Sequence, residues 1–228
     1  MRADNGTPES LAAGDATIRP AGEVDLHAVA ALHAAAFPGF FLTDLGMPFL
    51  RAYYRMVLRY EGGVFLVAEN GQGLAGFVAG FVVPHVFYAR MKAQRWRLLP
   101  RILLGLVARP RLLSRVLYNV ARVRRTAAVV PPSGENACEL SSLAVDPNRT
   151  RRGIGGALVR AFLAAAEFKQ ARSVFLTTDA EGNEAVRRFY EDLGFRQTRR
   201  FEMSGKRLMS EYAFAFAPHA PQDDPRSC

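Results

Sequence analysis

The chain has 228 residues, a formal net charge of +9 and a hydrophobic content of 50%, enough to bury a sizeable core. Its two cysteines, Cys138 and Cys228, do not make a disulfide framework. The sequence contains no run of about 18 apolar residues, so no membrane-spanning helix is expected. The polar N-terminus does not read as a secretory signal. We therefore expect a cytoplasmic protein with a single domain, 15–216, between disordered tails at 1–14 and 217–228.

The first part of the domain alternates strands and helices. A strand is predicted at 16–20, followed by helices at 25–36 and 45–59, where apolar residues recur at helical spacing. Strands at 64–69 and 74–83 are separated by an Asn-Gly-Gln-Gly sequence, which is a strong hairpin signal. His27 and His33 lie on the first helix and are predicted to face solvent or the edge of a helix contact. No metal-ligand spacing appears in the sequence.

Residues 85–134 form a basic insert. Eleven Lys and Arg residues and no Asp or Glu lie between Glu69 and Glu135. Residues 111–125 project onto a helical wheel with Arg on one face and Leu and Val on the other, so we predict a helical insert. Three roles stay open: a lid that packs on the domain, a peripheral contact with an anionic inner membrane surface, and a site for an acidic acceptor. Nucleic acid is the least favoured partner, because aromatic residues are sparse and no nucleic-acid motif is present.

The next strand, predicted at 138–145, contains an irregularity. Leu140 and Leu143 are an odd number of residues apart, which breaks the alternation of a regular strand. We therefore predict a β-bulge that frees backbone groups for a ligand. Cys138 is expected to be a small buried residue, because no His–Asp partner pattern surrounds it.

A glycine-rich basic loop connects this strand to a helix predicted at 154–168. Gly153, Gly155 and Gly156 let the backbone approach an anion closely, and the helix start presents unpaired amides and the positive end of its dipole. Arginines on the loop add guanidinium groups that suit phosphate oxygens. The spacing fits neither the G-x-G-x-x-G dinucleotide fingerprint nor the Walker pattern. The loop therefore predicts a phosphate site of another kind.

The chain continues with a strand at 173–178, a helix at 183–193 and two strands at 195–202 and 207–215. Asn183 and Tyr190 are two helical turns apart, so both can face one ligand from the same side of the helix. The elements together predict an α/β fold with a mixed sheet.

The region from Cys138 to about Phe201 resembles the GNAT superfamily of acyl-CoA-dependent N-acyltransferases. The family's Leu-x-Val-x-Pro strand end is matched by Leu143-Ala144-Val145-Asp146-Pro147. Its [Gln/Arg]-x-x-Gly-x-[Gly/Ala] loop is matched by Thr150-Arg151-Arg152-Gly153-Ile154-Gly155, in which Thr150 departs from the usual Gln or Arg. The later Asn183…Phe189-Tyr190-x-x-x-Gly194-Phe195 run is also typical. The resemblance implies a GNAT-like, mostly antiparallel central sheet flanked by helices, with acetyl-CoA as co-substrate and no metal.

The resemblance also implies roles for individual residues. Glu139 is the expected base, Tyr190 the expected acid for the departing thiolate, and the backbone amide of Val145 the expected oxyanion donor. Asn183 is expected to hydrogen-bond the pantetheine arm. Each residue also has a plainer alternative role: Glu139 as an ordinary glutamate at a strand edge, Tyr190 as a packed aromatic ring, and Asn183 as a helix N-cap. The full set expected to bind the co-substrate is Leu143, Val145, Thr150, Arg151, Arg152, Gly153, Ile154, Gly155, Gly156, Ala157, Asn183 and Tyr190.

By this resemblance the chain is an N-acetyltransferase that moves an acetyl group from acetyl-CoA directly to a primary amine, without a covalent enzyme intermediate. The basic insert favours a small anionic acceptor, such as an amino sugar, over a basic peptide. Two alternatives stay open: a protein or peptide N-acetyltransferase, and a non-catalytic module that binds acyl-CoA or associates with a membrane. The sequence does not define the oligomeric state.

Overall fold

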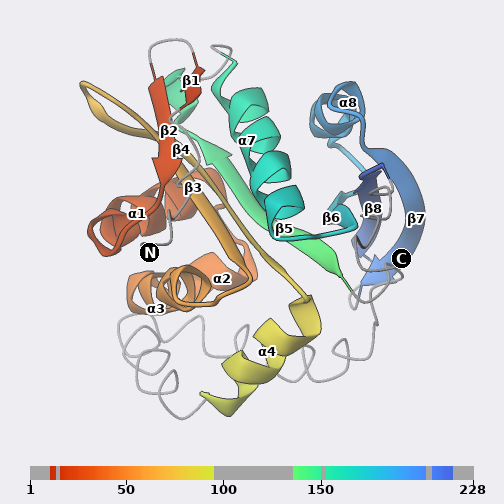
Figure 1. Ribbon diagram of the computed structural model, residues 1–228, viewed down its shortest axis with the longest axis horizontal. Coiled ribbons are helices and arrows are strands. Elements are labelled where there is room, and N and C mark those ends of the chain that lie inside the picture. The colour runs from red at the N-terminus through yellow and green to blue at the C-terminus, as the bar shows by residue number, and fades with distance from the viewer. Residues whose placement is uncertain (1–10, 14–15, 95–135, 150–152, 204–206, 218–228) are drawn as a thin grey trace, which may run out of the picture.

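The computed structural model describes residues 11–13, 16–94, 136–149, 153–203 and 207–217 (Figure 1). Most of the basic insert, including the helix predicted at 111–125, lies outside the described residues, as does nearly all of the predicted C-terminal tail. Within the described part of the chain, no helix is long and apolar enough to cross a membrane.

The described strands form one eight-stranded sheet in the order β1-β2-β3-β4-β5-β6-β8-β7. All neighbouring strands are antiparallel except β5 and β6, which are parallel. This confirms the predicted mixed, mostly antiparallel sheet. The strands are β1 Leu11–Ala13, β2 Ala16–Pro20, β3 Gly63–Asn70, β4 Gly73–Val82, β5 Ala137–Val145, β6 Ser173–Asp179, β7 Arg196–Met203 and β8 Arg207–Ala215.

The N-terminal tail predicted at 1–14 is wrong for residues 11–13. These residues pair with β2, with Leu11 opposite Ile18. Only two residues separate β1 from β2, a length typical of a tight hairpin connection. β1 therefore occupies the side of β2 away from β3 and satisfies backbone groups that an edge strand would leave open.

Helices cover both faces of the sheet (Figure 1). On one face α7 lies along β3, β4 and β5, and on the other α1 and α3 pack together against the same strands. The insert begins with α4, a helix that has Pro84 in its first turn and carries the start of the predicted helical insert. The helices are α1 Leu26–Ala36, α2 Phe41–Asp44, α3 Met47–Leu58, α4 Pro84–Ala93, α7 Ile154–Phe168 and α8 Glu184–Asp192, with short 3-10 turns at Glu23–Asp25 and Pro147–Arg149.

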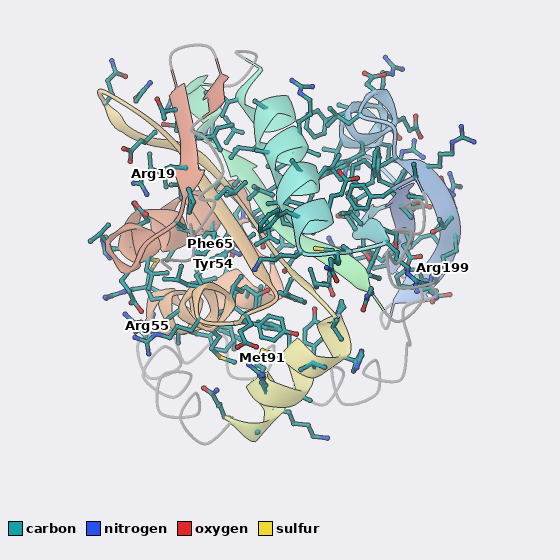
Figure 2. The ribbon with its side chains drawn as sticks, viewed as in Figure 1. Arg19, Tyr54, Arg55, Phe65, Met91 and Arg199 are labelled. Carbon is teal, nitrogen blue, oxygen red and sulfur yellow. The ribbon has the colours of Figure 1, made fainter. Side chains whose placement is uncertain are left out.

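Each face of the sheet has its own apolar core. The core under α7 contains Cys138, which is buried as predicted, together with Leu158 and Phe162. The core under α1 and α3 is aromatic. Figure 2 shows Tyr54 and Phe65 between α3 and the sheet, and their rings are stacked with centroids 5.5 Å apart. The two cores hold β5 from both sides, which fixes the strand that carries the site.

β5 and β6 pair only over a short distance. Their parallel register runs from Ala137 opposite Ser173 to Glu139 opposite Phe175, and no further pair follows. β6 continues to pair with β8 as far as Asp179. The edge of β5 beyond Glu139 is therefore not paired with β6, and the two strands leave an opening in the middle of the sheet.

Candidate active site

A β-bulge lies at Ser141, beside this opening. Ala79 of β4 is opposite Ser142, whereas the next residue, Gly80, is opposite Leu140, so Ser141 is the extra residue of β5. This confirms the bulge predicted between Leu140 and Leu143. Gly80 permits the bulge, because a Cβ at this position would lie 2.0 Å from the carbonyl oxygen of Glu139.

Two amides of β5 face the opening. Asp146 donates its amide to the carbonyl oxygen of Ala75 on β4, at 2.9 Å. Because successive amides along a strand point to opposite edges, the amides of Val145 and Leu143 point away from β4, toward the side on which β6 no longer pairs. Their side chains are half-buried against the core under α7. This edge of β5 can therefore bind an extended polar chain through the backbone.

The glycine-rich loop leads from the end of β5 into α7. Gly153 is the N-cap residue of α7 and has φ +74°, a left-handed conformation that favours glycine. The first turn of α7 presents amides without an intrahelical acceptor. A Cβ on Gly155 would lie 3.5 Å from the ring of Phe189 and 3.6 Å from the side chain of Val145, so the start of α7, the end of β5 and the middle of α8 meet here.

The other predicted loop residues are only partly described. Ile154 is buried and anchors the first turn of α7 in the core, whereas Gly156 and Ala157 are half-buried. Thr150, Arg151 and Arg152 lie outside the described residues. The described geometry is that of a helix N-terminus open to an anion, adjacent to the unpaired edge of β5.

Glu139 lies at the other end of the unpaired edge and faces α4. It is half-buried, and the Tyr88 hydroxyl of α4 donates a hydrogen bond to its Oε1 at 2.8 Å. Burial raises the pKa of Glu139 to about 7, and the Tyr88 hydrogen bond opposes that shift. The carboxyl is thus poised near neutrality. Sequence analysis did not identify Tyr88, because its partner is 51 residues away.

Tyr190 and Asn183 lie on α8. Tyr190 is 6% exposed, with the rings of Phe189 and Phe195 at centroid distances of 5.0 and 5.5 Å, and burial raises its pKa. Asn183 occupies the N-cap position of α8, but its side chain does not cap the helix. Its Nδ2 instead donates to Oγ1 of Thr178 on β6, at 2.6 Å. Tyr190 belongs to the core under α7, so it and Glu139 approach β5 from opposite faces.

His33 does not lie where the sequence predicted. His27 is exposed, but His33 is buried at 3% exposure, and its Nδ1 is 2.6 Å from the Tyr54 hydroxyl. The prediction that it faces solvent or a helix edge is therefore wrong. The reason is that α1 packs directly on α3, which turns this side of α1 inward.

Glu139 and Val145 lie opposite Phe81 and Gly76 of β4, which are five positions apart, so about 17 Å of strand separates them at about 3.3 Å per residue. Leu143 is nearer to Glu139 by two residues, or about 7 Å. Among the described residues, no group of three or more His, Cys, Asp or Glu could hold a metal ion.

A comparison with protein families identifies one family. The sequence profile of the Acetyltransferase (GNAT) family matches residues 26–195. No curated protein matches the chain by sequence. A ribosomal-protein-alanine N-acetyltransferase from Brucella melitensis is 16% identical with a TM-score of 0.57, and the match covers 87% of this chain and 99% of that one. A spermidine N-acetyltransferase from Vibrio cholerae is 13% identical with a TM-score of 0.54, and the match covers 88% of this chain and 94% of that one. At these identities the structural likeness shows the fold alone.

Proposed function

The chain belongs to the GNAT acetyltransferase family, and on that premise we propose that it transfers an acetyl group from acetyl-CoA directly to a primary amine. Members of this family use acetyl-CoA as co-substrate. The observation that carries the proposal is the position of Glu139, which is held near neutral pKa at one end of an unpaired strand edge whose other end leads into the glycine start of α7.

The described residues fit the co-substrate. The amide of Val145 would hold the pantetheine arm along the edge of β5, and Gly153 with the first turn of α7 would hold the pyrophosphate. Gly155 leaves the approach free, because a side chain there would extend between Val145 and Phe189. The bound co-substrate supplies a thioester carbonyl as the acetyl donor.

Glu139 is proposed to accept the proton that the amine loses as it attacks, directly or through one water. With a pKa of about 7, this carboxylate is about half ionised at neutral pH and is a stronger base than an ordinary glutamate. The Tyr88 hydroxyl occupies Oε1 and fixes the orientation of the carboxylate, which leaves Oε2 for the amine or the water.

The oxyanion donor is reassigned from Val145 to Leu143. About 17 Å of strand separates Val145 from Glu139, so the two cannot act on one carbonyl group. The amide of Leu143 follows the bulge, faces the same edge, and is the nearer of the two to Glu139. We therefore assign the Leu143 amide to the carbonyl oxygen, where negative charge develops, and the Val145 amide to the pantetheine arm.

Tyr190 is proposed to stabilise the departing thiolate. Burial raises its pKa above the ordinary value near 10, whereas a thiol titrates near 8.5. Complete proton transfer from Tyr190 to the thiolate is therefore uphill, and we assign to Tyr190 a hydrogen bond to the sulfur. Asn183, whose Nδ2 donates to Oγ1 of Thr178 near the end of β6, is proposed to contact the pantetheine arm from the other side of the opening.

The acceptor is proposed to be a primary amine. The two structural neighbours are named for acetylation of a ribosomal-protein alanine and of spermidine. The prediction that the acceptor is an anionic amino sugar depends on arginines of the insert that lie outside the described residues. The test is acetyl-CoA-dependent thiol release with three acceptors: an N-terminal alanine peptide, spermidine, and a phosphorylated amino sugar. The reaction class requires an acetylated product with one of them and its loss in Glu139→Gln. Tight binding of acetyl-CoA without turnover on any amine would support a non-catalytic module instead.

A further inference from the structure

The bulge in β5 changes which way two serines point. In a regular strand Ser141 and Ser142 would face opposite sides of the sheet. Because Ser141 is the extra residue of the bulge, both serines turn toward α3. The sequence therefore places two adjacent hydroxyls on the face that Glu139 shares.

Two consecutive tyrosines of α3 meet these serines. The Tyr53 hydroxyl is 2.6 Å from Oγ of Ser141, and the Tyr54 hydroxyl interacts with the hydroxyl of Ser142. Tyr53 and Tyr54 are 4% and 0% exposed. Water therefore has little access to either pair, and the Tyr53 hydroxyl depends on Ser141 as its partner.

A histidine of α1 extends one of these pairs. His33 Nδ1 is 2.6 Å from the Tyr54 hydroxyl, so a hydrogen bond links α1 to the tyrosine of α3 that lies beside Ser142. Burial lowers the pKa of His33 to about 4, which keeps the imidazole neutral at physiological pH. Its Nε2 is buried and has no hydrogen-bond partner among the described residues. A buried imidazole nitrogen without a partner lowers the stability of the fold. We therefore assign the role of His33 to the hydrogen bond between its Nδ1 and the Tyr54 hydroxyl.

We propose that Tyr53 and the His33–Tyr54 pair are positioning residues for the acetyl-transfer reaction. They hold Ser141 and Ser142 in the bulged conformation, and the bulge in turn aims the next amide on the open edge, that of Leu143, at the thioester carbonyl. This inference rests on the proposed function. The tyrosines and the histidine do not touch the reacting atoms; they act through the backbone of β5.

The test removes single hydroxyls and compares them with a matched control. Tyr53→Phe, Tyr54→Phe and Ser141→Ala are compared with Tyr60→Phe, whose hydroxyl donates to the carbonyl oxygen of Val82 at 3.1 Å and does not reach the bulge. We expect kcat to fall about tenfold in the three bulge variants, with the KM for acetyl-CoA and the Kd for free CoA within twofold of wild type. Free CoA has no acetyl carbonyl, so its affinity does not depend on the aim of that amide.

Two further measurements separate positioning from general stability. Tyr53→Phe combined with Ser141→Ala is expected to lose no more kcat than either single variant, because both remove the same hydrogen bond. Amide hydrogen exchange across 139–145 is expected to be faster in the bulge variants than in Tyr60→Phe. Exchange equal to that of the control overturns the inference, and so does a fall in kcat matched by an equal loss of CoA affinity. A wild-type protein that acetylates no amine refutes the proposed function, and the exchange result still decides whether the tyrosines hold the bulge.

Discussion

Replacing Tyr88 with phenylalanine removes the hydrogen bond that Tyr88 donates to the proposed base. The Tyr88 hydroxyl donates to Oε1 of Glu139 at 2.8 Å and stabilises the ionised carboxylate. The variant keeps the ring, whose contacts with Phe81 and Phe87 are apolar. Without the hydroxyl the ionised form loses its donor, so the pKa of Glu139 rises further above its value of about 7.

The size of the shift follows from the charge on the acceptor. A hydrogen bond to a charged group contributes about 1.5–3 kcal/mol, and one pKa unit corresponds to about 1.4 kcal/mol, so we expect a rise of about one to two units. At pH 7 the ionised fraction of Glu139 then falls from about one half to between about 9% and about 1%. The rate at pH 7 is therefore expected to fall about 5- to 50-fold and to recover above about pH 9.

The assay is the pH profile of kcat/KM for the amine that the panel identifies. Two other titratable groups near Glu139 in the described part of the chain are the Tyr53 hydroxyl from α3 and the Cys138 thiol on β5. Burial raises the pKa of both, so neither titrates in the range of the ascending limb. Tyr60→Phe is the control and leaves the limb in place. The titration of the acceptor amine affects all variants equally. A loss of rate that is the same at every pH, or an ascending limb that does not move, would refute the assignment of Glu139 as the base.

Three further predictions concern the same strand and its neighbours. Glu139→Gln is expected to lower kcat about 10²- to 10⁴-fold. Because folding raises the pKa of Glu139 from 4.5 to about 7, wild type loses stability as the pH rises from about 4.5 to about 7. The variant is therefore expected to be more stable than wild type by up to about 3 kcal/mol at pH 8, with no difference below about pH 4.5, and thermal unfolding across pH measures this. Tyr190→Phe is expected to lower kcat about tenfold or more with an unchanged Kd for CoA, and a wild-type rate would count against its contact with the thiolate. Gly153→Ala forces a side chain into φ +74° and is expected to cost about 1–2 kcal/mol in urea unfolding and to raise the KM for acetyl-CoA, whereas unchanged values would mean that the loop accepts a Cβ.

Local patterns predicted most of the elements. The helix at 154–168 and the strand at 207–215 have the predicted bounds, because each has a clear apolar period and a glycine or charged residue at its boundary. β1 was missed because its three residues have no period of their own and become a strand only by pairing with β2. Its structure is set by a partner, which local composition does not encode.

In the site, too, local patterns could be predicted and contacts between distant residues could not. The spacing of Leu140 and Leu143 predicted the bulge, since it is a property of one strand. Its partners were not predicted, because Tyr53 and Ser141 are 88 residues apart and the contact exists only after α3 packs on the sheet. One signal was available: a bulge turns two adjacent serines to the same face, and a Tyr-Tyr pair on an amphipathic helix is a matching set of donors.

The length of β5 also explains how one strand can serve both a polyanion and a base. Phosphates bound at the start of α7 would lie near Val145, about 17 Å from Glu139 along the strand. The Debye length at physiological ionic strength is about 8 Å, so their charge is largely screened at that distance. A carboxylate placed next to the glycine loop would instead meet the phosphates directly, and its pKa would rise on binding. Burial and the Tyr88 hydroxyl, rather than the bound co-substrate, therefore set the pKa of Glu139, and the base keeps the same strength before and after the phosphates bind.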